Sequence, residues 1–334
     1  MTSIALCGAG AIAGVHALAA RELGHSVVAV ASRTRATAEK RASDFGARVV
    51  EYDELPAGAD VVVVATPPAH HAAHTLRALA SGASVLAEKP LCRTLAEADV
   101  LCAAPGAERI VYAENLAFAP VISDFLARAR TLGPLTHLEA RTLQSRPNWG
   151  DFLDPAWGGG VLFDLGVHPL ALVVLVARAS GNGDVESVRA ELSGDATDTL
   201  ADVWLTFGSG LRAHVVASWE GPEAGVWDLQ ASSRTAVLRA DLRPDVALEL
   251  NGDPVRLAPT TVKIPQLEQF GYIEQLRAVV DRRASGGRSL MDVEFGRTML
   301  EIVAACYMSA RRGAEVPVPS GCDRERTPWE LWRG

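Results

Sequence analysis

The sequence predicts an α/β protein with two domains: an N-terminal Rossmann domain built on a parallel sheet, and a C-terminal α/β domain with a large, mostly antiparallel sheet. As far as Pro120, short runs of β-branched residues alternate with helical patterns, as in βαβ units. After Pro120 the expected strands are longer and alternate apolar with polar residues, which is typical of antiparallel sheets. The predicted domains are residues 1–118 and 119–334, which fits a chain of 334 residues.

In the first domain, strands and helices follow one another regularly. Residues 61–64 are four consecutive valines, a pattern typical of a strand buried on both faces of a parallel sheet. Helical patterns lie between such runs. The expected strands are 3–10, 26–32, 59–68, 83–91 and 109–115, and the expected helices are 11–24, 36–46, 70–82 and 94–104.

The second domain begins with a helical pattern over 121–133 and continues with strands. Two amphipathic helices are expected near the end of the chain, over 267–284 and 291–313. An apolar run over 161–177 contains Asp164, His168 and Pro169. The expected strands are 135–144, 185–192, 199–207, 211–220, 226–232 and 235–242.

Composition and charge narrow the class of partner. The formal net charge is −8 and there is no run of Lys or Arg, which argues against a nucleic-acid or anionic-membrane partner and favours a small molecule. The longest apolar run, 161–177, is shorter than the ~20 residues that a membrane span needs. The N-terminus shows no secretory pattern, so we expect a cytoplasmic protein.

Neither disulfides nor a metal centre are expected. The five cysteines show no CxxC spacing, which favours reduced, mostly buried thiols. His70, His71 and His74 suggest a metal site as an alternative, but a zinc site needs converging ligands, and no carboxylate or cysteine lies near them in sequence. We expect these histidines to line the helix that follows the valine strand.

The segment "CGAGAIAG" predicts a dinucleotide-binding turn. Gly8, Gly10 and Ala13 have GxGxxA spacing directly after the first strand and at the start of the first helix. Gly8 permits the tight turn, and Gly10 allows the backbone to approach a pyrophosphate at the helix N-terminus, where free N–H groups favour anions. Ala13 replaces the third glycine, which the pattern allows.

The end of the second strand favours NADP(H), with NAD(H) as the possible alternative. An NAD site places an acidic residue there to bind the ribose 2′-hydroxyl, whereas a 2′-phosphate favours a cation. Ser32 and Arg33 occupy this place, and Arg35 follows.

Three stretches together carry a family resemblance. "ATPPAHHAAHTLRALASGASVLAEKPL" contains Glu88-Lys89-Pro90, "GGGVLFDLGVHPL" contains Asp164 and His168, and both follow the N-terminal glycine motif in order. Over essentially its whole length the chain resembles the Gfo/Idh/MocA oxidoreductases, related to glucose-fructose oxidoreductase and inositol dehydrogenase. The resemblance implies a nicotinamide cofactor and hydride transfer to or from a sugar or cyclitol.

The resemblance also implies roles for single residues. Lys89 and His168 would be catalytic, with Asp164 orienting the histidine, and the Lys89–Pro90 bond would be cis. At i and i+4, Asp164 and His168 should share one face of a helix, with Pro169 kinking it just after the histidine. Thr66, Pro67 and Glu88 should join the cofactor contacts, and a loop bearing Arg146, Asn148 and Trp149 could bind the sugar.

Several alternatives stay open. Asp164 and His168 could be a hydrogen-bonded core pair without chemistry. The fold also suits a glycosidase that retains NAD, and a regulator that only senses the cofactor. We further expect a homo-oligomer, a dimer or tetramer, associating through the C-terminal sheet with apolar residues such as Val203, Leu205 and Val215.

Overall fold

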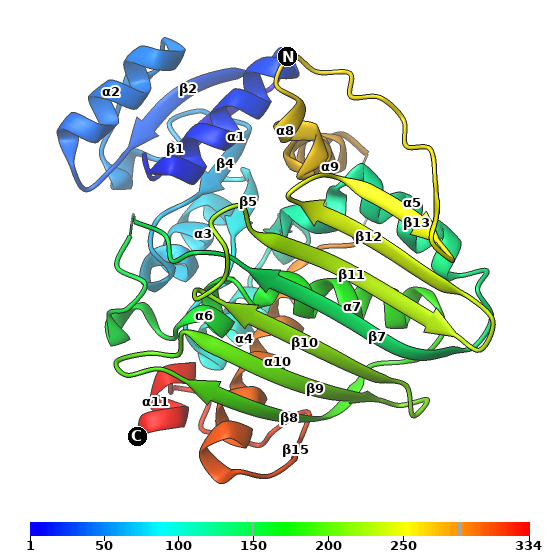
Figure 1. Ribbon diagram of the computed structural model, residues 1–334. Helices are drawn as coiled ribbons and strands as arrows, with labels where there is room; N and C mark the ends of the chain where they lie inside the picture. Colours follow the sequence, from blue (N-terminus) through cyan, green and yellow to red (C-terminus); the bar gives the residue numbers. More distant parts are fainter. Residues whose placement is uncertain (149, 286–288) are drawn as a thin grey trace. The chain divides into compact units, whose positions relative to one another are not determined.

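A computed structural model describes residues 1–148, 150–285 and 289–334 (Figure 1). The chain forms two compact units, one comprising Met1–Phe118 and Thr260–Arg297, the other Ala119–Pro259 and Thr298–Gly334. The predicted domains place Thr260–Arg297 in the second domain, whereas here this segment packs with the first unit. Its helix α9 buries Ile273, Leu276 and Val279 and packs on α1, β5 and β6, contacts that no local sequence pattern reveals.

The first unit contains a six-stranded parallel sheet in the order β3-β2-β1-β4-β5-β6. The four valines of β4 are at most 1% exposed, which confirms the strand predicted to be covered on both faces. The parallel arrangement brings the carboxyl ends of all six strands to one edge. The strands are β1 Ser3–Cys7, β2 Ser26–Ala31, β3 Arg48–Val49, β4 Val61–Val64, β5 Ser84–Glu88 and β6 Ile110–Ala113.

Helices connect these strands at close to the predicted positions. The expected helix 267–284 is interrupted at Phe270–Gly271, where Gly271 has a φ of 82°, a conformation that favours glycine. The helices are α1 Ala11–Glu22, α2 Arg35–Phe45, α3 His71–Ala80, α4 Leu95–Ala103, α8 Pro265–Gln269 and α9 Tyr272–Ser285, with short 3₁₀ turns η1 Tyr52–Glu54, η2 Pro68–His70, η3 Ala107–Arg109 and η4 Asn115–Phe118.

The second unit contains a nine-stranded sheet in the order β14-β13-β12-β11-β7-β10-β9-β8-β15. It is antiparallel except for the pair β7 and β10, which confirms the mostly antiparallel prediction. The strands are β7 Leu135–Leu143, β8 Val185–Ser193, β9 Leu200–Phe207, β10 Arg212–Ser218, β11 Val226–Ser233, β12 Val237–Arg243, β13 Ala247–Leu250, β14 Asp253–Pro254 and β15 Val316–Pro317.

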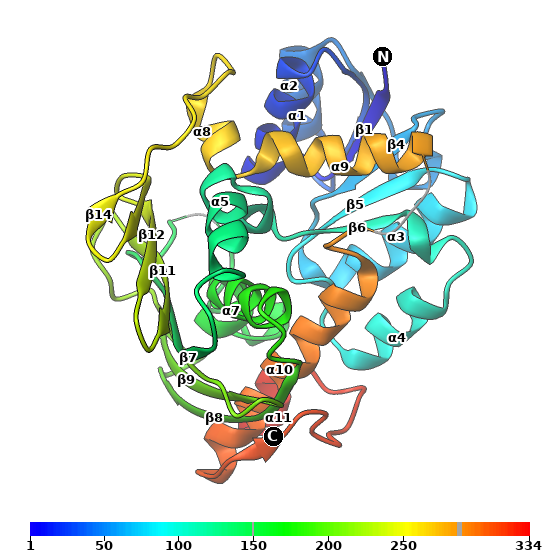
Figure 2. The same ribbon diagram turned by 90° about the vertical axis from the view of Figure 1, so that its right-hand side faces the viewer.

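Helices cover one face of this sheet (Figures 1 and 2). The central helix α7 packs against β7, β10 and β11, and α5 packs against β12. Within the described ranges, no single helix is long and apolar enough to span a membrane; only the bent pair Pro155–Asp164 and Val167–Ala179 meets that test by length and composition together. The helices are α5 Pro120–Ala129, η5 Pro155–Trp157, α6 Val161–Asp164, α7 Val167–Ala179, α10 Val293–Arg312, which begins in the first unit, and α11 Pro328–Arg333.

The residues that we expected at an oligomer interface lie on the helix-covered face of the sheet. Val203, Leu205 and Val215 are at most 1% exposed, so they belong to the core beneath the helices. The expectation that they form a contact surface is wrong. Alternation in a strand predicts that one face is apolar, but it does not tell whether that face packs inside the unit or against another chain.

Candidate active site

The predicted dinucleotide turn lies at the carboxyl edge of the parallel sheet, between β1 and α1. Gly8 has a φ of 117°, and a Cβ added to it would lie 2.4 Å from the carbonyl oxygen of Ala65, so the turn requires glycine. A Cβ on Gly10, which is exposed and precedes the first residue of α1, would meet nothing within 4 Å. Ala13 is fully buried in the first turn of α1. The start of α1 is therefore open to an anionic ligand.

The loop after β4 runs beside this turn. The Thr66 side chain is buried, and its Oγ1 has no hydrogen-bond partner among the described residues, whereas Pro67 is exposed. Such a buried hydroxyl without a partner suits a ligand that would bind it. The open helix start and this hydroxyl both fit a dinucleotide, so the residues present can hold the predicted cofactor.

Ser32 and Arg33 lie directly after β2 at the same edge. The Arg33 side chain is exposed, and its backbone N–H donates to the Tyr52 hydroxyl at 3.0 Å. Tyr52 stacks on His74 with ring centroids 4.6 Å apart. Burial, assisted by His70 and Arg77, lowers the pKa of His74 to about 4, so this ring is neutral at pH 7. Arg35 is in an exposed ion pair with Glu39, at 2.9 Å.

Lys89 follows the last residue of β5, and its bond to Pro90 is cis. The Lys89 backbone N–H donates to Oε2 of Glu88 at 3.0 Å, while Oε1 of Glu88 is 2.7 Å from Nε2 of His16. On the other side, the ring of buried His71 lies with Nδ1 2.9 Å from the Pro90 carbonyl oxygen and Nε2 2.6 Å from that of Thr66. His71 thus connects the loop after β4 with the segment that carries Lys89.

In the second unit, Asp164 and His168 lie on two helices instead of one. Asp164 ends α6 and His168 is the second residue of α7, and the two helical segments bend by 49° at the break. At Gly166 the backbone N–H bonds to the Val161 carbonyl five residues back, at 2.8 Å, which interrupts the regular helical pattern. The predicted kink after His168 is also wrong. Pro169 lies in the first turn of α7, where its missing N–H has no helical partner to lose, and the helix continues to Ala179.

Both side chains are buried, Asp164 at 8% and His168 at 5% exposure. The His168 ring stacks on Trp227 of β11, with centroids 5.7 Å apart and an angle of 29° between the planes. The Arg243 guanidinium lies over the same Trp227 ring, 5.4 Å from its centroid. His168 therefore has a fixed aromatic partner on the sheet.

Asp198, which the sequence analysis did not identify, anchors α6. Its carboxylate accepts hydrogen bonds from the backbone N–H groups of Gly160 at 3.0 Å and Leu162 at 2.8 Å, and from the Tyr307 hydroxyl. Burial raises the pKa of Asp198, against the opposing effect of these donors. A Cβ on Gly160 would lie 2.2 Å from the Asp198 carbonyl oxygen, which explains the last glycine of the run 158–160. A buried acid can cap a helix from a loop that is distant in sequence without leaving a local signal.

The predicted substrate loop follows β7. Arg146 and Asn148 are exposed there, outside any helix or strand. Trp149 lies outside the described residues. The sequence analysis also did not identify the roles of Tyr52 and Trp227. Tyr52 is a single aromatic residue in a turn, and only the fold brings it to Arg33. Trp227 is a single aromatic residue in a strand, and only the fold brings it to His168.

Models of one protein family match both units. Residues 2–113 match the model described as "Oxidoreductase family, NAD-binding Rossmann fold". Residues 126–235 match the model described as "GFO/IDH/MocA C-terminal domain". Among curated relatives, dTDP-3,4-didehydro-2,6-dideoxy-alpha-D-glucose 3-reductase of Streptomyces violaceoruber is 34% identical over 225 residues, covering 63% of this chain and 64% of the relative. D-xylose 1-dehydrogenase (NADP(+)) of Hypocrea jecorina is 31% identical over 180 residues, covering 46% and 45%.

A solved structure supports the fold along nearly the whole chain. GenD2 from gentamicin A biosynthesis, in complex with NAD, superposes with a TM-score of 0.82 at 26% identity and covers 95% of this chain and 96% of its own. The two curated relatives are matched over less than two thirds of their length, so their substrates are properties of those proteins alone.

Proposed function

Because the chain belongs to the GFO/IDH/MocA family of NAD(P)-binding oxidoreductases that act on sugar-related substrates, we propose that it transfers hydride between NADP(H) and a sugar or cyclitol carbon, as an alcohol or a ketone. The observation that carries this proposal is the position of Lys89. It follows β5 at the carboxyl edge where the glycine turn after β1 also lies, and ligands of parallel sheets bind at this edge.

We propose that Lys89, Asp164 and His168 act on one substrate. When bound, the nicotinamide supplies or accepts the hydride. Lys89 hydrogen-bonds the reacting oxygen as an ammonium group and stabilises charge that develops on it. His168 takes or gives the hydroxyl proton, for which an imidazole is suited near neutral pH. Asp164 orients the His168 ring. Arg146 and Asn148 supply donors for further hydroxyl groups of the substrate.

A cofactor-coupled screen tests this function. NADPH oxidation and NADP⁺ reduction would be followed with aldoses, inositols, keto-sugars and a dTDP-linked keto-sugar. We expect stoichiometric hydride transfer with at least one of them. Tight cofactor binding without turnover on the whole panel would instead favour a regulator. Release of a free sugar from a glycoside without net change of cofactor would favour an NAD-retaining glycosidase.

Arg33→Ala tests the cofactor preference. The guanidinium is exposed at the end of β2, and we propose that it pairs with the 2′-phosphate of NADPH. The substitution should raise the Kd for NADPH by about 10- to 100-fold, since a hydrogen bond to a charged group is worth about 1.5–3 kcal/mol, and should leave that for NADH nearly unchanged. Fluorescence titration with both cofactors measures this. Arg35→Ala is the control, because Arg35 is paired with Glu39. Equal affinities in the parent protein would contradict the proposal.

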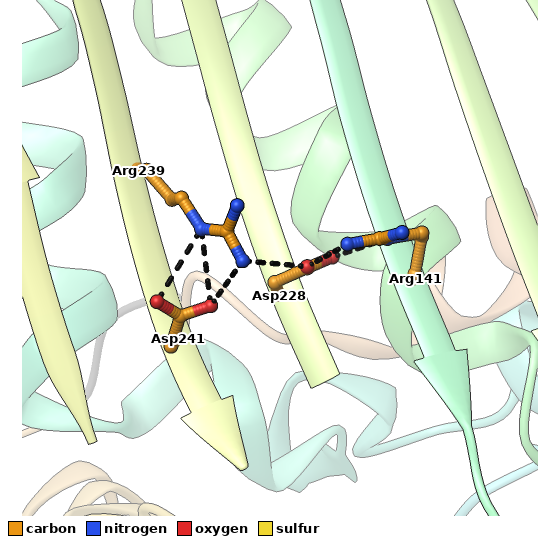
Figure 3. A network of polar contacts seen from close by, with 4 residues as sticks. All are labelled: Arg141, Asp228, Arg239 and Asp241. Atoms are coloured by element: carbon orange, nitrogen blue, oxygen red, sulfur yellow. Dashed lines mark hydrogen bonds and ion pairs between the residues drawn. The ribbon is translucent and has the colours of Figure 1, made fainter. Parts of the chain in front are cut away.

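We also propose that the chain forms a dimer or tetramer through the sheet face that no described helix of the second unit covers. On this face Asp228 accepts hydrogen bonds from Arg141 and Arg239, and Arg239 also binds Asp241 (Figure 3). These charges of β7, β11 and β12 already satisfy one another. Paired charges are far less costly to bury against a second copy than unpaired ones.

Trp204→Glu tests this association. Trp204 is 37% exposed on β9 and stacks on His214, which is itself hydrogen-bonded to Asp202. A carboxylate here, beside Asp202, would put an unpaired charge into the interface and should raise the dissociation constant at least about tenfold. Light scattering across micromolar concentrations measures the mass. Val100→Glu, at an exposed position of α4, is the matched control. A monomeric parent protein would refute the proposal.

A further inference from the structure

The first unit buries an imidazole–carboxylate pair next to Lys89. His16 lies in the second turn of α1, and Glu88 is the last residue of β5. Their Nε2 and Oε1 atoms are 2.7 Å apart, and the two side chains are 0% and 7% exposed. Because a carboxylate only accepts hydrogen bonds, Nε2 of His16 is the donor. Nδ1 of the same ring is buried without a hydrogen-bond partner among the described residues, so the ring's only such partner there is Glu88.

Both oxygens of Glu88 are used. While Oε1 accepts from His16, Oε2 accepts the backbone N–H of Lys89. The His16 ring is further held by an edge-to-face contact with Tyr272 of α9, with centroids 5.8 Å apart. The position of the Lys89 backbone therefore depends on a carboxylate that is itself fixed by α1, the helix that begins at the dinucleotide turn.

The pair also sets the charge beside Lys89. Burial acts to raise the pKa of Glu88, but the hydrogen bond and charge of His16, with the charge of Lys89, outweigh it, so the pKa is lowered and Glu88 is an anion at neutral pH. Without the His16 donor, burial would raise the pKa of Glu88 with less opposition. Among the described residues, the titratable groups that act on Glu88 or that it acts on include His16 of α1, Lys89, His71 of α3, Tyr112 of β6 and Tyr272 of α9, and Glu114 also acts on both tyrosines.

We propose that His16 is a positioning residue for Lys89: its hydrogen bond holds the Glu88 carboxylate in place, and Glu88 in turn holds the Lys89 backbone. This inference rests on the proposed function, in which Lys89 binds the reacting oxygen. It also makes α1 serve twice, with its first turn facing the cofactor phosphates and its second turn fixing the segment that carries the lysine.

The test uses the full chain and its small number of lysines. Lys40, Lys89 and Lys263 are the only three in the sequence, so reductive ¹³C-methylation gives lysine signals that Lys→Arg variants can assign. The Lys89 signal should sense the titration of Glu88 as an inflection at acidic pH. His16→Leu removes the donor and should move this inflection to higher pH. His16→Gln retains a side-chain N–H donor without the charge and should move the inflection part of the way back, and Glu88→Gln should abolish it.

Activity provides the second readout. In His16→Leu the acid limb of kcat/KM should move to higher pH, because Glu88 takes up its proton sooner, with a loss of about 10- to 100-fold at mildly acidic pH. The Kd for NADPH should stay close to that of the parent. A variant with a lower thermal midpoint but an unmoved Lys89 inflection and an unmoved acid limb would overturn the inference, since that is the result for a packing residue.

Two features keep the test decisive. If His16→Leu does not fold, Glu88→Gln serves as the test variant instead. An unchanged kcat in Glu88→Gln would overturn the inference. The Lys89 inflection needs no substrate, so it separates the two proposals. Turnover with an inflection that His16→Leu fails to move counts against the role of His16, whereas a moved inflection in a protein without turnover counts against the proposed function alone.

Discussion

His168→Ala is expected to lower kcat by about 10²- to 10⁴-fold, the usual loss when a general acid–base group is removed. The ring is 5% exposed and stacks on Trp227, so it is held in one orientation, as proton transfer to a defined atom requires. NADPH affinity should hardly change, because the dinucleotide turn belongs to the other unit of the chain. Stopped-flow measurement of hydride transfer separates this chemical step from cofactor binding.

A matched variant distinguishes chemistry from packing. Truncating a buried side chain costs stability, so the thermal midpoint of His168→Ala should be compared with that of Leu170→Ala, a fully buried position on the same helix. We expect both to lose stability and only His168→Ala to lose kcat by orders of magnitude. Near-full turnover of His168→Ala on the true substrate would mean that Asp164 and His168 are a core pair without chemistry.

The parallel sheet of the first unit was predictable because its signals are local. Four consecutive valines and a glycine turn at the end of a strand are complete within a few residues. The position of α9 was not predictable. Its amphipathic pattern gives a helix, but the partners of its apolar face, α1, β5 and β6, are far away in sequence.

The break between α6 and α7 shows the same limit at the candidate site. From the sequence, "VLFDLGVHPL" is one apolar run with two polar residues a helical turn apart. The two helices separate at Gly166, whose backbone N–H bonds to the Val161 carbonyl, and the start of α6 is held by Asp198, 36 residues beyond Leu162. Spacing identified Asp164 and His168 as notable residues, but it reveals neither the backbone break between them nor the distant loop residue, Asp198, that holds the start of α6.

Lys89 differs from His168 in how its position is held. Its backbone N–H binds Glu88, and the next carbonyl, of Pro90, lies against the His71 ring, so the segment is fixed on both sides of the lysine. A side chain on such a segment can present its ammonium group repeatedly at the same place. Fixed charge of this kind stabilises a developing negative charge without reorganisation during the reaction.

Lys89→Ala is therefore expected to lower kcat at least as much as His168→Ala, by about 10²- to 10⁴-fold or more. Lys89→Arg should not restore it, because a planar guanidinium spreads its charge over a different shape and does not release a proton. The Lys89→Arg variant keeps the positive charge of the side chain and changes its geometry, so comparing it with the parent protein separates the two effects. Single-turnover rates with bound NADPH measure the effect, and Lys263→Arg, at an exposed position, is the control for the substitution itself. If the Lys89→Arg variant kept more than about a tenth of the parent kcat, a positive charge alone would be sufficient at this position.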